Sequence, residues 1–333
     1  MTHDMAIIGG GCAGFGAAMY AGRFQLKVVV FSDNLGGTIT LTDIVENYPG
    51  FKKLTGGELA EKLIEHAKDY NIDIIEEKIA DVSKNGSFFL LKTEDGNEFM
   101  SKTVVFATGT IWRKLGVSGE KEFANKGVHY CALCDGAVYK NKVIGVVGGS
   151  DSAAKEALLL SDYGSKVYII YRGEKIRPEP VNMTRVSNNR KIEIINNTNV
   201  REIKGDKFVT HVVLDKPYKG KTELPLDALF IEIGHIPLSS LTKKLGVALN
   251  EKGEIIIDKM ARTSVPGVYA AGDVADTEFK QAITGVAEGV SAAYSAYKYL
   301  GESSAEEPPA KKGNRVDAAH METAVKKPRK KNR

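Results

Sequence analysis

Short apolar runs, separated by glycine-rich turns and amphipathic stretches, dominate the first 300 residues. Met5–Ile8 predicts a buried strand, an Ala-rich stretch to about Phe24 predicts a helix, and Lys27–Phe31 predicts a second strand. Residues 57–70 predict a further helix, because apolar side chains recur on one helical face: Leu59, Leu63, Ile64 and Ala67. The chain therefore opens on a β-α-β pattern.

The pattern then changes to strands of period two, which predict a β-meander. Asn-Gly and Asp-Gly turns at 85–86 and 95–96 separate apolar strands. The last of these strands, Thr103–Ala107, ends in Thr108-Gly109. The meander is therefore an insertion, after which the chain returns to its first unit.

A second β-α-β pattern follows the first. It is predicted from a strand at Lys142–Val147, a helix at Ala154–Tyr163 and a strand at Val167–Tyr171. The rest of the pattern predicts hairpin strands between about Ile192 and Leu226, a strand at Leu229–Ile233, strands again from about Gly246 to Asp273, and a closing helix at Gln281–Leu300. The repetition predicts an α/β fold with two similar units.

Composition narrows the class of protein. The 333 residues are 43% hydrophobic and 26% charged, as in an ordinary globular protein, and they suffice for two domains. The sequence contains no run of 18 apolar residues, so we expect no membrane span. Three cysteines do not make a disulfide scaffold, and the first residues lack the basic region of an export signal, so we expect a cytoplasmic protein.

The net charge of +4 belongs to the end of the chain. Residues 301–333 hold nine Lys/Arg and five Asp/Glu, whereas the preceding 300 residues hold 37 of each. A neutral body argues against a nucleic-acid footprint on the folded part. The polar residues 301–333 predict a disordered tail, whose basic cluster at 326–331 leaves three roles open: binding of an anionic surface, a localisation signal, or a solvated extension.

Two glycine-rich turns stand between strand and helix, one in each unit. Gly9, Gly11 and Gly14 fit G-x-G-x-x-G, in which the glycines allow a tight bend, approach of the backbone to a pyrophosphate, and close helix packing. Cys12 in this turn is expected to be a small buried filler. The second turn, 148–153, departs from the pattern because Ser150 replaces its second glycine.

The strongest chemical signal is the segment Cys131-Ala132-Leu133-Cys134-Asp135. Two cysteines at this spacing form a disulfide or a reactive dithiol, and a helix N-terminus stabilises a thiolate. The carboxylate of Asp135 is placed to donate or accept a proton. A zinc site is the alternative, but zinc needs four ligands, Cys12 is the only other cysteine, and the histidines are scattered.

These motifs, in this order and spacing, resemble the low-molecular-weight thioredoxin reductases over residues 5–300: GGGCAG, ENYPG, ATG, CALCDG, the second glycine turn, IGHIP, and AAGDV followed by KQA. The resemblance implies a Rossmann-like FAD domain, residues 1–115 and 243–300, that is split by an NAD(P)H domain, residues 116–242, carrying the CxxC. It also implies a homodimer, and rotation of the inserted domain about hinges near residues 115 and 242.

The resemblance assigns roles to the site residues. Cys134 would face the flavin, Cys131 would attack the disulfide of a thioredoxin-like protein, and Asp135 would move the proton. The residues expected to hold FAD are Gly9, Gly11, Gly14, Asp33, Thr38, Asn47, Thr108, Gly109, Asp273, Gln281 and Ala282. For Asp273 an N-cap role is equally compatible with the sequence, and Asp33 stands one place later than the usual ribose-binding acid.

The electron donor is the least determined part. NADPH would be held by Gly148, Ser150 and Ser152, with Arg172 and Arg177 at its 2′-phosphate. The family's NADPH users read roughly H-R-R-x-x-x-R here, and this chain lacks the histidine and the second arginine. We therefore expect NADPH to be the favoured donor, but with a weaker preference over NADH than in relatives that keep the full motif. A dithiol flavoenzyme that uses NADH or ferredoxin, and a flavoprotein sensor or scaffold, remain the alternatives.

Overall fold

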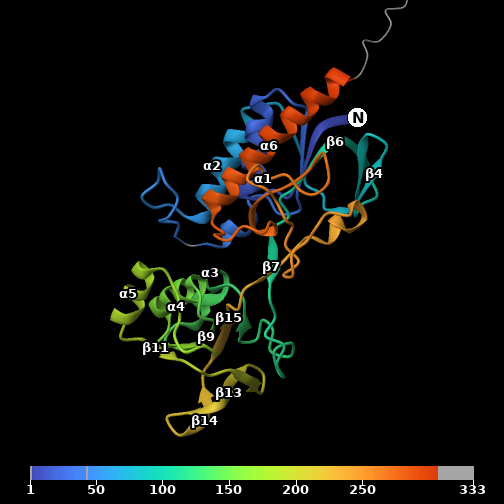
Figure 1. Cartoon of the computed structure of the whole chain (residues 1–333). Coiled ribbons are helices and arrows are strands. Elements are labelled where there is room, and N and C mark those ends of the chain that lie inside the picture. The colour runs from blue at the N-terminus through green and yellow to red at the C-terminus, as the bar shows by residue number, and fades with distance from the viewer. Residues whose placement is uncertain (1, 43, 307–333) are drawn as a thin grey trace, which may run out of the picture.

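The computed structural model describes residues 2–42 and 44–306, which form two lobes (Figure 1). One lobe contains segments from both ends of the described chain, coloured blue to cyan and orange to red, and the other contains the segment between them, coloured green to yellow. The first lobe is therefore discontinuous in sequence. The α/β class, with two nucleotide-binding-type sheets, is as the sequence predicts.

A seven-stranded sheet forms the centre of the discontinuous lobe. Its order is β3-β2-β1-β6-β5-β4, with β17 pairing to β6. The parallel strands are β1 (Thr2–Ile8), β2 (Val28–Phe31), β3 (Ile72–Ile75), β6 (Glu98–Phe106) and β17 (Val268–Ala270), and the antiparallel pair of the meander is β4 (Ile79–Asn85) and β5 (Phe88–Thr93). The lobe's helices are α1 (Cys12–Arg23), α2 (Gly56–Lys68) and α6 (Ala282–Glu306). Every residue of β2 is buried, as expected of a strand covered on both faces.

The inserted lobe repeats this architecture on a smaller scale. Its parallel sheet has the order β11-β10-β9-β15-β8 and consists of β8 (Val128–His129), β9 (Val143–Val147), β10 (Lys166–Ile170), β11 (Ile192–Ile195) and β15 (Ala228–Ile231). A separate antiparallel sheet contains β12 (Val200–Gly205), β13 (Val209–Tyr218) and β14 (Lys221–Pro225). The lobe's helices are α3 (Ala132–Asp135), α4 (Asp151–Tyr163) and α5 (Pro180–Asn188).

Two short antiparallel strands join the lobes: β7 (Thr110–Trp112), where the chain leaves the first lobe, and β16 (His235–Pro237), where it returns (Figure 1). Each hydrophobic core cluster of the described residues draws its side chains from one lobe only. The two lobes are thus separately packed bodies on a two-stranded connection. None of the helices in the described ranges is long and apolar enough to cross a membrane.

Three predicted elements need correction. The closing helix does not end near Leu300, because α6 continues to Glu306; residues 307–333, the rest of the predicted tail, lie outside the described residues. The strands predicted from Gly246 reduce, between 246 and 273, to β17 and isolated bridges such as Leu249–Ile255. Finally, β11 is a parallel edge strand and not part of a hairpin, because the polar helix α5 provides a crossover that its composition concealed.

Candidate functional site

The first glycine turn combines two tightly packed glycines with one open one. A Cβ at Gly9 would lie 2.1 Å from the carbonyl oxygen of Ala107, and one at Gly14 would lie 1.9 Å from the carbonyl oxygen of Gly9. A Cβ at Gly11 would meet nothing closer than 3.9 Å. Gly11 is the N-cap of α1 and no side chain caps this helix. The turn therefore presents bare backbone at a helix N-terminus, which fits the pyrophosphate of a dinucleotide such as FAD.

Another predicted FAD residue, Asp273, lies beside this turn. Asp273, in the 3-10 helix Gly272–Val274, lies against the start of α1, since a Cβ on Gly272 would be 2.9 Å from that of Ala13. Burial, aided by the charge of Asp273, raises the pKa of the Cys12 thiol to about 11, so this cysteine stays protonated at neutral pH.

The remaining predicted FAD residues come from several segments that are far apart in the sequence. Thr108 donates its hydroxyl to the carbonyl of Leu238 at 2.8 Å, and Gly109 accepts from the Leu238 N–H at 3.0 Å. Asn47 donates to the Gln281 side chain at 2.9 Å, next to Ala282 at the start of α6. Two further predicted residues are exposed: Asp33, just after β2, and Thr38, in the 3-10 helix Gly37–Leu41.

The second glycine turn has the same form. A Cβ at Gly148 would lie 2.2 Å from the carbonyl oxygen of Glu232, so this glycine is required by packing. Ser150 is the N-cap of α4, but its hydroxyl makes no capping bond, and both Ser150 and Ser152 are exposed. Ser150 thus leaves the N-terminus of α4 open to an anion in spite of the lost glycine.

The loop after β10 folds back onto this turn. The Arg177 N–H donates to the carbonyl of Gly149 at 2.7 Å, and its guanidinium lies 3.4 Å from the Tyr171 hydroxyl. Arg172 and Arg177 are both exposed, and within the described chain neither pairs with a carboxylate. Two guanidinium groups without a carboxylate partner in the described chain therefore lie beside the second nucleotide turn. Glu174 in the same loop is also exposed, and a carboxylate here could bind the free 2′-hydroxyl of NADH.

The two cysteines form a disulfide, with their Cα atoms 5.4 Å apart, at the start of α3. This bond removes both sulfurs from zinc ligation. The Sγ of Cys131 accepts the N–H of Cys134 at 3.2 Å, a contact that would stabilise a Cys131 thiolate after reduction. Cys131 is buried, at 7% exposure, whereas Cys134 is exposed. The hydrogen bond favours Cys131 as the thiolate, and exposure favours Cys134 as the sulfur that is easier to reach.

Two polar groups beside the dithiol, His129 and the paired carboxyls of Glu156 and Glu232, could not be predicted from the sequence. His129 lies at the end of β8, with Nε2 2.7 Å from the Tyr139 hydroxyl and Nδ1 3.1 Å from Oδ2 of Asp135. Glu156 of α4 accepts the N–H of Ala132 at 3.0 Å and neighbours Glu232. Burial raises the pKa of Glu156 to about 7; burial and the Glu156 charge raise that of Glu232 to about 9.

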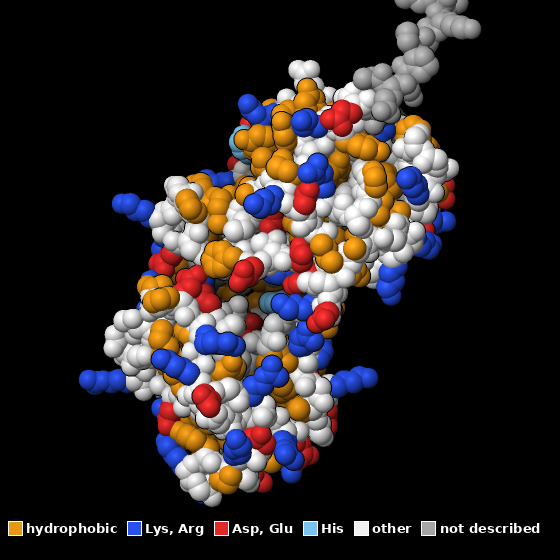
Figure 2. Space-filling view, viewed as in Figure 1, with side chains coloured by type: hydrophobic (Ala, Val, Ile, Leu, Met, Phe, Trp, Pro, Cys, Tyr) orange, Lys and Arg blue, Asp and Glu red, His pale blue; other side chains and the backbone are white. Residues whose placement is uncertain are grey.

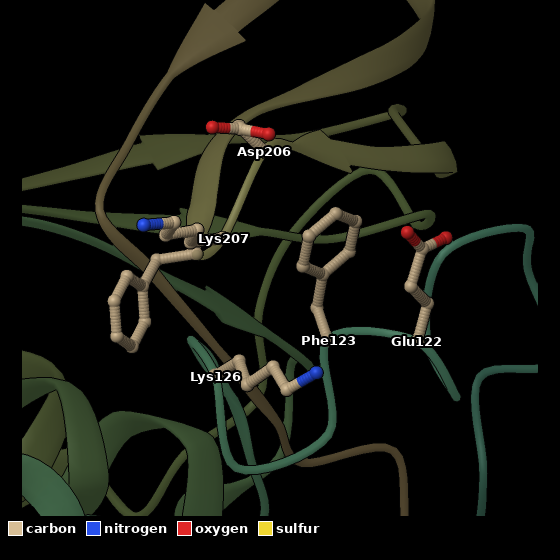
Figure 3. Close-up of a pocket in the computed structure, with 6 residues that line it drawn as sticks. Glu122, Phe123, Lys126, Asp206 and Lys207 are labelled. Atoms are coloured by element: carbon tan, nitrogen blue, oxygen red, sulfur yellow. The ribbon is translucent and has the colours of Figure 1, made fainter.

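The surface is hollowed at the waist between the lobes, where acidic and basic side chains gather (Figure 2). A separate cavity of about 440 Å³ lies between the loop before β8 and the β12–β13 turn (Figure 3). Its lining is Glu122, Phe123, Lys126, Asp206, Lys207 and Phe208. None of these residues belongs to the dithiol or to a glycine turn, so we assign this cavity no part in the chemistry.

Comparison with known proteins gives a consistent result. A model of the pyridine nucleotide-disulphide oxidoreductase family matches residues 3–289. The thioredoxin reductase of Listeria innocua is 38% identical over 303 residues, 90% of this chain and 94% of that protein. The structure of Lactococcus lactis thioredoxin reductase in its FR conformation is 38% identical, covers 90% of this chain and 99% of its own, and has a TM-score of 0.87. Streptococcus pyogenes thioredoxin reductase covers the same shares at 36% identity, with a TM-score of 0.61.

Proposed function

The chain belongs to the thioredoxin reductases, within the pyridine nucleotide-disulphide oxidoreductase family, and we propose that it carries electrons from NADPH through FAD to the disulfide of a thioredoxin. The observation that carries the proposal is the Cys131–Cys134 disulfide at the start of α3, in a chain with an open glycine turn in each lobe. A sensor or scaffold would have no use for this dithiol.

The chain's residues divide the work. The turn at Gly9, Gly11 and Gly14, together with Asp273 and the other predicted FAD residues, holds FAD. The turn at Gly148 and Ser150 holds NADPH, with Arg172 and Arg177 at the 2′-phosphate. Bound FAD would supply the redox chemistry that couples oxidation of the nicotinamide to reduction of the Cys131–Cys134 disulfide.

Cys131 is proposed as the thiol that attacks thioredoxin and Cys134 as the one that exchanges electrons with the flavin. The N–H of Cys134 points at the Sγ of Cys131, so the charge of a thiolate is best stabilised there. Attack by Cys131 forms a mixed disulfide and releases one thioredoxin thiol. Attack by Cys134 then closes the Cys131–Cys134 bond and releases the second.

A hinge between the lobes completes the cycle. In the present arrangement Cys134 is exposed to solvent. We propose that the inserted lobe, predicted as residues 116–242, rotates on the β7–β16 connection against the FAD-binding lobe, predicted as residues 1–115 and 243–300, to bring the dithiol to the flavin. Residues after β16, such as Ser239 and Leu241, already pack with the FAD-binding lobe, which supports a second hinge at β16. The two relatives with equal coverage but TM-scores of 0.87 and 0.61 support two arrangements of the same lobes. A homodimer and a cytoplasmic location, where thiols stay reduced, belong to the same proposal.

Single-cysteine variants test the function and the order of the thiols. The partner is a thioredoxin whose second active-site cysteine is replaced by serine, so that a mixed disulfide cannot resolve. Cys134→Ser should form a stable mixed disulfide with it, and Cys131→Ser should not. Both variants should keep FAD and lose turnover, whereas Cys12→Ser, the matched control, should keep turnover because its half-buried thiol is protonated.

Two results count against the proposal. Thioredoxin reduction at the parental rate by either dithiol variant would exclude the dithiol from the reaction. Trapping by Cys131→Ser alone would reverse the roles of the two thiols and agree with their exposure.

A further inference from the structure

His129 places a titratable ring behind the acid–base residue of the dithiol. Its ring is 5% exposed and stacks on Phe230, with centroids 5.2 Å apart at an interplanar angle of 26°. Nε2 lies 2.7 Å from the Tyr139 hydroxyl and Nδ1 lies 3.1 Å from Oδ2 of Asp135. The side chains Asp135, His129 and Tyr139 therefore form a continuous row that leads inward from the residue next to Cys134.

The contact between His129 and Asp135 lacks a hydrogen-bond donor, so it can accept a proton. Nδ1 is buried and makes no aligned hydrogen bond among the described residues. With the ring proton on Nε2 and donated to Tyr139, Nδ1 holds a lone pair that faces a carboxylate oxygen, and both groups are acceptors. One proton placed between them would satisfy both.

An aspartate alone is a poor base for a thiol, because its pKa in model peptides is about 3.9, against about 6.5 for histidine and about 8.5 for cysteine. We propose, on the basis of the thioredoxin reductase function above, that His129 is a positioning residue that acts through Asp135 and stores the proton of Cys134 during reduction of thioredoxin.

The proton balance closes within one turnover. When Cys134 attacks Sγ of Cys131 in the mixed disulfide, the bond between Cys131 and thioredoxin breaks and the Cys131–Cys134 bond forms. The proton of the Cys134 thiol passes to Asp135 and rests between Asp135 and His129. It is then returned to the departing thioredoxin thiolate, so no external acid or oxidant is needed.

The surroundings hold His129 neutral at rest. Burial lowers its pKa below the usual range, against the opposing effect of Asp135. Burial, with the charges of Asp135 and Asp227, raises the pKa of Tyr139, so this phenol keeps its proton. Of the other titratable groups nearby, Glu156 of α4 and Glu232, just after β15, form a carboxyl pair, and Lys142 is paired with Asp227.

Others face away. Tyr130, which follows His129 directly after β8, donates its hydroxyl to Glu120 at 2.6 Å, and the Lys114 ammonium lies over its ring. The parent protein and a His129 variant therefore share all of these neighbouring titratable groups. A difference between their pH profiles can then be assigned to the imidazole.

The test is a single turnover of the FAD-loaded, dithiothreitol-reduced protein with oxidised thioredoxin across about pH 5 to 8. The parental rate should fall as the pH drops below the pKa of His129, since an imidazolium cannot accept another proton. His129→Phe keeps the ring packing, and His129→Gln keeps a polar partner for Tyr139. Both should lose this acid limb and react on the order of a hundredfold more slowly near pH 7.

Two controls make the result specific. Tyr139→Phe should keep the acid limb because both proton-sharing groups remain. In NMR titrations, the His129 signal, identified by its absence from His129→Phe, should titrate at lower pH in Asp135→Asn, because the opposing carboxylate charge is lost. A His129→Phe protein with the parental rate and acid limb would overturn this inference alone, whereas a parent that reduces no thioredoxin at any pH would overturn the proposed function.

Discussion

Glycines in the first nucleotide turn serve two purposes that the structure separates. Gly9 and Gly14 lack a side chain because backbone oxygens occupy the place of a Cβ, 2.1 and 1.9 Å away. Gly11 lacks one although there is room for it, the nearest atom being 3.9 Å away. Only Gly11 is therefore explained by a ligand that must approach the backbone.

This difference predicts opposite behaviour of two alanine variants. Gly11→Ala should melt within about 2 °C of the parent when FAD is removed from both, but bind FAD about ten- to a hundredfold more weakly, because the methyl group enters the space of the pyrophosphate. Gly14→Ala should lower the melting temperature even without FAD, because its methyl group meets the Gly9 carbonyl. The flavin-to-protein absorbance ratio after gel filtration and thermal melting of both forms check this; equal FAD retention in Gly11→Ala and the parent would contradict it.

Arg172 carries the prediction about the donor. Each charge-assisted hydrogen bond contributes about 1.5–3 kcal/mol, so Arg172→Ala should raise the KM for NADPH about ten- to a hundredfold and leave that for NADH nearly unchanged. Arg201→Ala, an exposed arginine on β12, is the matched control and should change neither value. Steady-state kinetics with both nucleotides measure this, and an equal effect on NADH would remove the 2′-phosphate from the role of Arg172.

Functional residues could be predicted from the sequence where a short-range motif identifies them. The glycines and the CxxC are defined by spacing within a few positions. His129, Glu156 and Glu232 escaped prediction because β8, α4 and β15 meet only in the folded lobe. The fold of the loop at Arg177 depends on long-range hydrogen bonds, such as the one from its N–H to the carbonyl of Gly149, which the local sequence does not indicate.

Elements show the same division. Strands with continuous apolar runs, such as β2 and β9, were predicted to within one residue. The polar helix α5 was missed because its hydrophobic side chains are few, and the irregular stretch after Gly246 was read as strands because apolar runs do not distinguish strands from buried loops.

The end of α6 sets a truncation experiment. A protein that stops after Glu306 keeps the whole helix and should retain its melting temperature and FAD content. One that stops after Ala293 loses the buried Ala296 and the bond from the Ser295 hydroxyl to the Met260 carbonyl, at 2.7 Å, and should melt lower, by roughly 2–4 °C per kcal/mol lost. A large loss in the longer protein would show that residues 307–333 contribute to the fold.

For the whole molecule, the relative position of the lobes is the decisive variable. Arg185 on α5 and Glu46 of the other lobe form an ion pair across the waist, with Nη2 and Oε2 2.9 Å apart. Both side chains are partly exposed, so the pair contributes about 0.2–1 kcal/mol and is screened by salt. It favours the present arrangement weakly, as expected if the inserted lobe rotates and returns in every turnover as proposed above.

Arg185→Ala should therefore shift the balance between the two arrangements at most about fivefold, and only at low salt. Small-angle X-ray scattering at low and high salt measures the shift. Arg190→Ala, an exposed arginine just after α5, is the control and should scatter like the parent. A scattering profile of Arg185→Ala that is identical to the parent at low salt would show that the ion pair has no part in the balance.

Stopped-flow reduction of the FAD-loaded protein by NADPH, NADH and reduced ferredoxin, followed by addition of oxidised thioredoxin, tests the proposed electron path most directly. We predict that NADPH bleaches the flavin fastest and NADH more slowly, and that thioredoxin restores the oxidised spectrum through Cys131 and Cys134. Flavin that is reduced by ferredoxin but by neither nucleotide, or that thioredoxin fails to reoxidise, would contradict this path.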